Sequence, residues 1–299
     1  MKKPFGQAHP DTAAAHRAAL QAGARAALRY RLCVPREAMR GAVGTRAGMQ
    51  SGVSIDFRDY RDYAPGDDVR HIDWNLYART ERLIVKLFRE EVTPHLDLLL
   101  DGSRSMHLPG TDKAAAALHL TALLAAAAAH AACTCKVWSA GAACVPVPAG
   151  AHHAAWRTPP DFESAGSPAP GLAAAAGAFK RHGLRVLVSD LLWDDDPLHV
   201  LWPLAENAAA LYVVQVLTDG ERHPRQTGNL RLHDVESGQT RDLFVDQAAL
   251  DRYRSGLHAH QTAWRDACRR CGARWIPLPA EGLEQDGALA PLQRHGLIE

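Results

Sequence analysis

The sequence predicts an α/β protein, a three-layer, doubly wound and mostly parallel sheet that follows an N-terminal β-rich extension. Short apolar runs end at Asp101, Asp190 and Leu217, and each has the length of a strand buried on both faces. Segments with helical periodicity separate these runs. Strands that alternate with helices form parallel βαβ units with right-handed crossovers, which place helices on both faces of one sheet.

Composition divides the chain into three segments. Residues 1–25 are a polar, alanine-rich lead-in, either frayed or a short helix; residues 26–92 form the β-rich extension, and residues 93–299 form the sheet domain. A chain of 299 residues is long enough to bury a large core. Within the extension, residues 54–80 mix charges of both signs with aromatic residues, which disfavours a disordered tail.

Periodicity, turn residues and caps predict the individual elements. Apolar runs and alternation predict strands over 83–88, 96–100, 136–139, 143–147, 185–190, 211–217 and 274–278, with two more strands inside 229–245. Helical periodicity predicts helices over 114–132, 172–181, 194–206 and 247–270. Gly141 marks a hairpin turn, and Gly183 and Gly272 follow helix ends, where glycine is common.

The stretch 114–132 has the length of a membrane span and contains no formally charged residue. Alanine contributes little to insertion, and two histidines and one threonine interrupt the run. Thr111 and Asp112 offer an N-cap for the helix of a soluble protein. We therefore expect a helix packed on the sheet and no membrane span. The first residues, MKKPFGQAHPDTAAAH, lack the apolar region of a secretory signal, so we expect a cytoplasmic protein.

Charge and cysteine usage exclude some functions. Charged residues make up 22% of the chain and the formal net charge is +1, so no general attraction to nucleic acid or anionic membranes is expected. Arginines gather between residues 25 and 46, but no recognition motif accompanies them, so nucleic acid is not an expected partner. Six scattered cysteines fit a reduced compartment. Four of them are either ordinary thiols or a zinc site: Cys133, Cys135, Cys268 and Cys271.

The candidate site follows the apolar run in HLDLLLDGSRSM, residues 95–106. In an extended loop alternate residues face the same way, so the oxygens of Asp101, Ser103 and Ser105 converge beyond the end of the strand. Hard oxygen ligands of this kind suit Mg²⁺ or Mn²⁺. A second buried strand ends at Asp190, which places another carboxylate at the same edge if the two strands are neighbours.

Residues 54–80 allow two interpretations. In the first, Arg70 pairs with Asp67, Asp68 or Asp73, and such pairs brace a folded loop. In the second, the segment is a partner-docking rim, because arginine, tyrosine and tryptophan dominate protein interfaces. The candidate partner-binding residues are Arg70, Asp73 and Trp74.

Two stretches carry a resemblance to known families. The sequence DGSRSM resembles the DxSxS metal-ion-dependent adhesion site of von Willebrand factor A-type domains, and DFRDYRDYAPGDDVRHIDWNLYART followed by DGSRSM resembles the bacterial family called domain of unknown function 58. The resemblance implies a von Willebrand factor A-like fold for residues 93–299. It also implies that Asp101, Ser103 and Ser105 bind the metal directly, while Asp190 acts through water.

Such sites take a further hydroxyl from a threonine in the middle loop. This chain has no threonine there, so Ser164 or Ser167 would substitute, and we expect Ser167 among the metal ligands. The family resemblance implies a protein partner, a MoxR-type AAA+ ATPase or its client.

The resemblance favours a non-catalytic adaptor whose metal leaves one coordination position for an acidic side chain of the partner. The alternative is a Mg²⁺-dependent phosphohydrolase with Asp101 as nucleophile. Enzymes of the haloacid-dehalogenase type use DxD at this point. Here the second position is Ser103, which removes the acid/base carboxylate.

Overall fold

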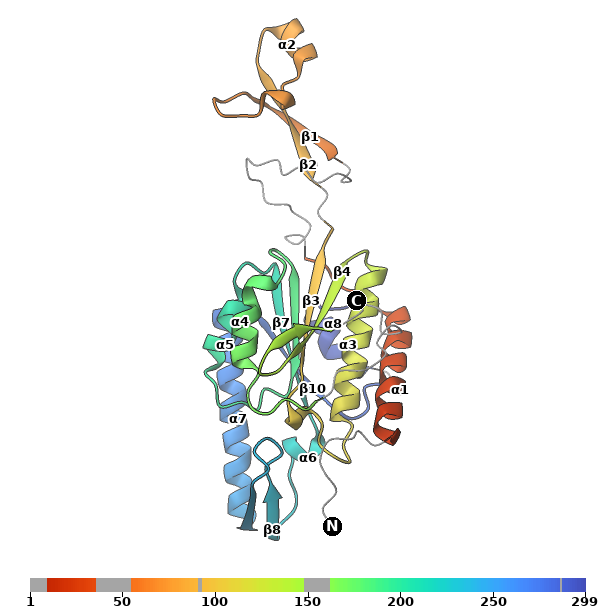
Figure 1. The fold of residues 1–299 in the computed structure, drawn as a ribbon, viewed down its shortest axis with the longest axis vertical. Coiled ribbons are helices and arrows are strands. Elements are labelled where there is room, and N and C mark those ends of the chain that lie inside the picture. The colour runs from red at the N-terminus through yellow and green to blue at the C-terminus, as the bar shows by residue number, and fades with distance from the viewer. Residues whose placement is uncertain (1–9, 36–54, 91–92, 148–161, 286) are drawn as a thin grey trace. The chain divides into compact units, whose positions relative to one another are not determined.

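The computed structural model describes residues 10–35, 55–90, 93–147, 162–285 and 287–299. It divides into two compact units, one formed by residues 1–35 and 94–299 and the other by residues 36–93. The first unit contains a six-stranded sheet with the order β10-β7-β6-β3-β4-β5 (Figure 1). Its strands are β3 (His95–Asp101), β4 (Thr134–Ala140), β5 (Cys144–Pro146), β6 (Leu184–Ser189), β7 (Ala210–Leu217) and β10 (Arg274–Pro279).

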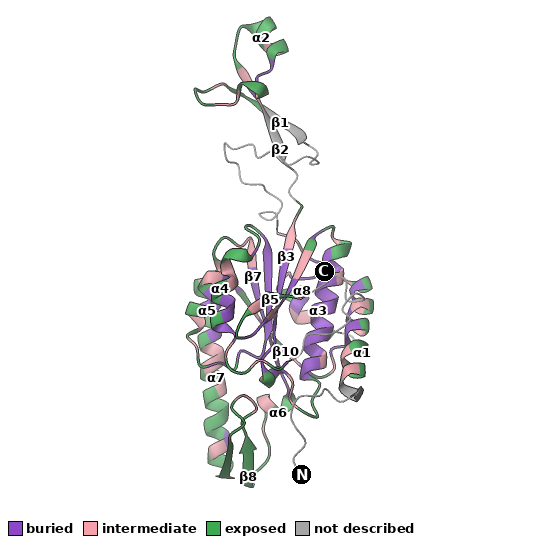
Figure 2. Ribbon diagram, in the orientation of Figure 1, coloured by how far each residue is buried: buried purple, intermediate pink, exposed green. Residues whose placement is uncertain are grey.

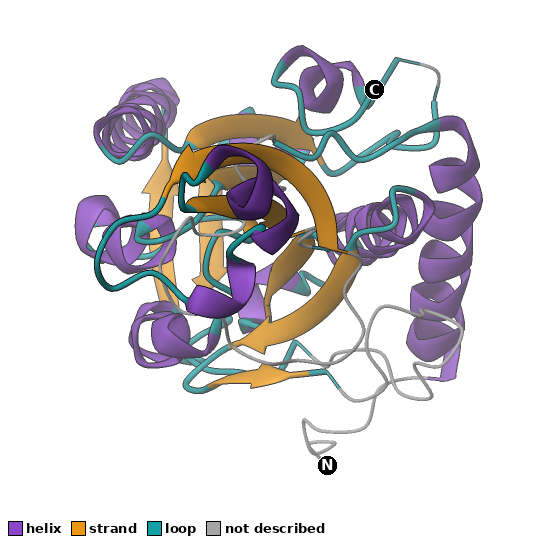
Figure 3. Ribbon diagram, turned by 90° about the horizontal axis from the view of Figure 1, so that it is seen from above, coloured by secondary structure: helices purple, strands orange, loops and turns teal. Residues whose placement is uncertain are grey.

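All neighbouring strands of this sheet are parallel except β4 and β5, which form the expected hairpin. Helices cover both sides of the strands (Figure 3). The helices of the unit are α1 (Pro10–Ala26), α3 (Lys113–His130), α4 (Ala169–Ala175), α5 (Pro197–Ala205), α6 (Asp219–Arg222), α7 (Gln247–Arg270) and α8 (Ala290–Arg294). The predicted α/β class with a mostly parallel sheet is confirmed.

Two apolar cores lie on the two faces of the sheet. Leu98 and Leu100 of β3 share one core with α3 and α8, and Leu99 shares the other with α4, α5 and α7. Successive side chains of a strand point to opposite faces, so the fully buried run of β3 feeds both cores. Figure 2 shows this burial along the central strands and α3.

The helix α3 is long and apolar enough to cross a membrane by length and composition alone, the one such helix among the described residues. In the structure, however, 78% of it is buried within the fold. Its small side chains allow close packing on the sheet on one side and on α1 on the other. At the contact with α1, a Cβ atom on Gly23 would overlap the carbonyl oxygen of His119.

The chain divides at residues 35/36 and 93/94, whereas the sequence analysis placed its boundaries at 25/26 and 92/93. The expected lead-in contains the helix α1, which packs on α3 through residues such as Ala19 and Leu20. After α1, Leu32 bridges to Ile298. The alanine-rich composition left a helix here as one of two interpretations because alanine carries little hydrophobic signal, yet alanine packs well where two helices approach closely.

The helix expected over 172–181 is also corrected. The structure has α4 over Ala169–Ala175, a 3-10 turn over Ala176–Ala178, and extended backbone at Phe179. The Phe179 ring is buried edge-to-face against Trp138, with ring centroids 5.1 Å apart, and Arg185 lies over it. Because of this packing, the helix ends earlier than the helix propensity of its residues predicts.

The second unit is described by itself. Its strands β1 (Ile55–Asp62) and β2 (Ile84–Glu90) pair antiparallel, and the helix α2 (Trp74–Thr80) lies between them in sequence. Asp73 caps α2, because its Oδ1 accepts hydrogen bonds from the N–H groups of Asn75 and Leu76. Residues 36–54, which include much of the basic stretch 25–46, lie outside the described residues.

Asp97 in β3 supports the sheet end opposite to the candidate site. It is buried, its Oδ1 accepts from Trp138 Nε1 at 2.8 Å, and its Oδ2 accepts from the Lys180 N–H at 2.8 Å. Burial favours the neutral acid, but hydrogen bonds from His95, Trp138 and Lys180 outweigh it and lower the pKa of Asp97.

We expect Asp97→Ala to lower the free energy of unfolding by about 2–4 kcal/mol, because the buried Trp138 N–H and the part-buried Lys180 N–H lose their acceptor. Urea denaturation measures the loss. The control is Asp266→Ala on the exposed surface of α7, which should change stability by less than about 0.5 kcal/mol. If both variants lose the same small amount, Asp97 does not have this role.

Candidate functional site

Two buried carboxylates meet at one edge of the sheet. The strands β3 and β6 are hydrogen-bonded parallel neighbours, with Leu100 opposite Val188. Asp101 is the last residue of β3, and Asp190 directly follows β6. Both side chains are fully buried. The sheet therefore brings together the two acids that the sequence placed at its strand ends.

Asp101 is fixed by hydrogen bonds to both carboxylate oxygens. Its Oδ1 accepts from the Ser103 N–H at 2.8 Å, and its Oδ2 accepts from Ser189 Oγ at 2.6 Å. The hydroxyls of Ser103 and Ser105 lie 3.0 Å apart, so both turn toward the same point of the loop. Burial and the neighbouring charge of Asp190 raise the pKa of Asp101 to about 7. The role of Ser189 was missed in the sequence, although it directly precedes Asp190.

A lysine that the sequence analysis did not single out balances the charge of this edge. Lys113 is the first residue of α3 and is fully buried. Its Nζ lies 2.7 Å from Asp190 Oδ2 and 2.6 Å from Glu221 Oε1. Burial alone would lower the pKa of Lys113, but the charges of Asp190 and Glu221 prevail and raise it. Asp190 is thus an ion-pair partner of an internal ammonium group.

The middle loop is the segment that precedes α4, and it contains Ser164. Ser164 lies next to the DGSRS loop, residues 101–105. The Ser164 N–H donates to the carbonyl of Gly102 at 3.1 Å, and the Arg104 N–H donates to the carbonyl of Ser164 at 3.0 Å. The Ser164 hydroxyl accepts from the Ala142 N–H at 3.0 Å. Ser167, the expected metal ligand, instead accepts from the Ala169 N–H at 3.1 Å, at the start of α4. The two serine hydroxyls are therefore engaged with backbone donors.

Glu236 is a further residue that sequence reasoning missed. It lies in the turn between β8 (Gly228–His233) and β9 (Thr240–Val245), which the sequence predicted only as a hairpin turn. Its Oε1 accepts from the Ser105 N–H at 2.8 Å, and its Oε2 accepts from the Gly166 N–H at 2.9 Å. Arg104 Nη1 donates to its carbonyl at 3.1 Å. The hairpin tip thus carries a carboxylate onto the DGSRS loop.

The donor set at this edge fits a small, hard cation. The carboxylate of Asp101 and the hydroxyls of Ser103 and Ser105 are the oxygen ligands that Mg²⁺ and Mn²⁺ prefer. Nowhere in the described chain do three or more histidine, cysteine, aspartate or glutamate side chains form a metal cluster, so such a site relies on hydroxyls. Lys113 already supplies one positive charge to Asp190, which leaves Asp101 as the carboxylate for a cation.

The zinc alternative finds no support. All six cysteines are free thiols, and burial raises the pKa of Cys133 to about 11 and that of Cys268 to about 12. No three histidine, cysteine, aspartate or glutamate side chains of the described residues form a group that could hold a metal ion. The four cysteines are ordinary thiols of the fold.

The residues around Asp101 weigh against a role as nucleophile. An attacking carboxylate needs a second acid or base within reach of the substrate, and the position two residues on is Ser103.

The candidate partner-binding residues of the second unit differ in their surroundings. Trp74 is 58% exposed and lies edge-to-face with Tyr77, which is 40% exposed. Asp73 is buried as the cap of α2 and also accepts from Lys86 Nζ at 3.1 Å. Arg70 pairs with Asp68, not with Asp67 or Asp73. Only Trp74 of the three therefore presents apolar surface to a partner.

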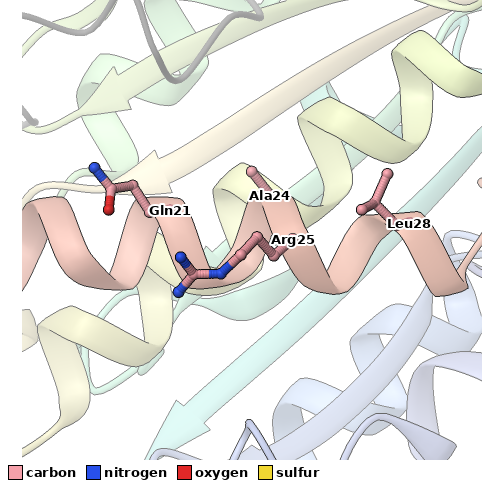
Figure 4. Close-up of a pocket in the computed structure, with 4 residues that line it drawn as sticks. All are labelled: Gln21, Ala24, Arg25 and Leu28. Atoms are coloured by element: carbon pink, nitrogen blue, oxygen red, sulfur yellow. The ribbon is translucent and has the colours of Figure 1, made fainter.

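A shallow surface hollow lies over α1, lined by Gln21, Ala24, Arg25 and Leu28 (Figure 4). None of the residues of the DGSRS loop or of its carboxylate partners lines it. It is a separate feature of the helix surface.

Several solved structures are similar to this chain. An aerotolerance-related membrane protein from Bacteroides fragilis matches with a TM-score of 0.42 and 12% identity, over 67% of this chain and 97% of that one. BatB from Bacteroides thetaiotaomicron matches with a TM-score of 0.38 and 11% identity, over 67% of this chain and 98% of that one. A von Willebrand factor type A protein from Catenulispora acidiphila matches with a TM-score of 0.31 and 12% identity, over 63% of this chain and 44% of that one. The fold class rests on the strand order of this chain itself.

Two relatives by sequence carry the name "Uncharacterized protein". Rv1480 of Mycobacterium tuberculosis is 29% identical over 252 residues, which cover 79% of this chain and 78% of the relative. Mb1516 of Mycobacterium bovis matches with the same identity and coverage. The family model described as "Protein of unknown function DUF58" matches residues 59–263, more than half of the chain. The chain belongs to this family, DUF58.

Proposed function

We propose that this protein is a non-catalytic, metal-dependent protein-binding adaptor. Asp101, Ser103 and Ser105 would hold Mg²⁺ or Mn²⁺ at the edge of the sheet. A bound cation would supply an open coordination position for a carboxylate of the partner. The observation that carries the proposal is the meeting of these three oxygen-bearing side chains beside a second buried carboxylate, Asp190.

The chain's own groups preorganise this edge. Ser189 and the Ser103 N–H hold the Asp101 carboxylate in one orientation. The Leu192 N–H and Lys113 do the same for Asp190, and the ammonium group reduces the repulsion between the two acids. A site whose residues are locked before the ligand arrives loses less entropy on binding.

The partner that we propose is a MoxR-type AAA+ ATPase or its client, in the cytoplasm. The exposed apolar side chains of the second unit support a protein-docking role there. Trp74 is joined by Val69, which is 55% exposed, and by Tyr77. Tryptophan and tyrosine are enriched among the residues that dominate binding energy in protein interfaces.

The test combines metal calorimetry with partner capture. The wild type is expected to bind Mg²⁺ or Mn²⁺ and to retain a MoxR-type ATPase from its own organism more strongly with the metal than with a chelator. Ser105→Ala is expected to weaken metal binding at least tenfold and Asp101→Ala to abolish it. Trp74→Ala is expected to weaken capture at least tenfold with metal binding unchanged, because it lies in the other unit.

Asp266→Ala, on the exposed surface of α7, is the matched control for loss of a carboxylate and should leave both measurements unchanged. Absence of metal binding to the wild type, or binding that Asp101→Ala does not alter, would contradict the metal site. Turnover of generic phosphate esters that Asp101→Asn abolishes would contradict a non-catalytic role.

A further inference from the structure

Glu236 occupies a small anion-binding site that the chain builds from two loops. One N–H group comes from Ser105 in the DGSRS loop, and the other comes from Gly166 in the middle loop. Each donates to a different oxygen of the same carboxylate, at 2.8 Å and 2.9 Å. Two donors spaced for the two oxygens of one carboxylate form a site for that chemical group, and hydrogen bonds to a charged acceptor are stronger than neutral ones.

The loop pairing fixes the spacing of the two donors. Ser103 and Ser164 form a parallel bridge between the DGSRS loop and the middle loop, so Ser105 and Gly166 lie two residues beyond paired positions. Hydrogen bonds between Ser164 and its neighbours Gly102 and Arg104 hold this bridge. The donors thus belong to the sheet domain, and hydrogen bonds that do not involve Glu236 hold the two loops together.

The hairpin that carries Glu236 is built to present it, yet it is weakly attached. Asp234 orders the turn, because it accepts from the Glu236 N–H at 2.9 Å and bonds the Ser237 hydroxyl. The strands β8 and β9 pair with each other and with no strand of the six-stranded sheet. Both strands are largely exposed, and Phe244 is 69% exposed. Segments with little buried surface open at low cost in free energy.

The Glu236 carboxylate has no cationic side chain within ion-pair distance among the described residues. Its two bonds are those from the Ser105 and Gly166 N–H groups. A carboxylate of another protein could make the same two bonds, so exchange costs the other contacts of the hairpin and the effective concentration of an intramolecular ligand. The site is next to the hydroxyls of Ser103 and Ser105, where the proposed function places the partner's acidic side chain.

We propose that the Ser105 and Gly166 N–H groups form the docking point for an acidic side chain of the partner, and that Glu236 fills it in the free protein. Binding of the partner then displaces the hairpin tip. This inference rests on the proposed function, because it names the group through which the partner binds the same edge. It identifies the partner's contact as an exposed aspartate or glutamate.

An amide titration with sodium acetate tests the docking point without a partner or a metal. The titration is done in the presence of a chelator. In Glu236→Ala, the Ser105 and Gly166 N–H resonances are expected to shift at acetate concentrations at least tenfold lower than the acetate concentrations that shift them in the wild type. The reason is that an intramolecular carboxylate competes at a high effective concentration. Sodium chloride at equal ionic strength should not shift them.

Asp242→Asn is the matched control, because Asp242 is an exposed carboxylate of the same hairpin that pairs with Arg231. It removes the same charge and should titrate like the wild type. The proposal is overturned if acetate leaves both amides of Glu236→Ala unmoved, or if Asp242→Asn responds as Glu236→Ala does.

Capture of the ATPase separates this inference from the proposed function. Glu236→Ala is expected to raise capture at least threefold if both hold. If the amides titrate but capture is independent of Asp101, the proposed function fails and the docking point stands. If capture depends on Asp101 but the amides do not titrate, the docking point fails alone.

Discussion

Replacing Lys113 with methionine is expected to lower the free energy of unfolding by about 3–5 kcal/mol, because it leaves a buried charge without its partner. Lys113 and Asp190 are both fully buried, with 2.7 Å between Nζ and Oδ2. Methionine keeps much of the side-chain volume of lysine. The loss of stability is therefore due to the removed charge and not to a cavity. Asp190 would then face the carboxylate of Asp101 with no cation between the sheet edge and α3.

Urea denaturation of three variants separates charge from packing. The double variant Lys113→Met with Asp190→Asn removes both charges and is expected to recover at least half of the loss. Lys180→Met, which changes an exposed lysine, is the control and should stay within about 0.5 kcal/mol of the wild type. A loss for Lys113→Met no larger than that of Lys180→Met would show that the ion pair does not stabilise the fold.

The strands were predictable because each carries its own local signal. A run such as 96–100 is too apolar to be anything but buried, and its abrupt end at Asp101 marks the sheet edge. The helix over 247–270 was likewise predicted with the bounds that the structure has. Helix α1 and the early end of α4 depend on distant packing, against α3 and around Phe179, which no local pattern reports.

The candidate site could be predicted only where its residues follow strands directly. Asp101, Ser103, Ser105 and Asp190 do so, and parallel pairing brings them to one edge. Lys113 begins a helix, and Glu236 lies in a hairpin far along the chain, so their contacts depend on tertiary structure alone. The available signal for Lys113 was its position, directly before the apolar run of a helix expected to be buried. Lysine is almost never fully buried unless it is paired, so a lysine at this position indicates an acidic partner.

The contribution of Asp101 to the stability of the wild type is expected to fall as the pH rises from about 4 to about 7. Burial and the charge of Asp190 raise the pKa of Asp101 from 3.8 to about 7. Between these values the folded state binds more protons than the unfolded state, so each rise in pH favours unfolding.

Asp101→Asn isolates this contribution, because titrating groups that do not interact with Asp101 cancel when the two proteins are compared. The stability of the wild type relative to Asp101→Asn should fall by up to about 1.4 kcal/mol per pH unit between about pH 5 and pH 7, and then level off. Urea denaturation in a chelating buffer measures the difference, so that no cation favours the ionised carboxylate. A difference that stays constant or rises with pH would mean that Asp101 is already ionised in the metal-free fold. In that case Lys113 would be neutralising both acids of the edge, and a divalent cation would meet a preformed anionic site rather than displace a proton.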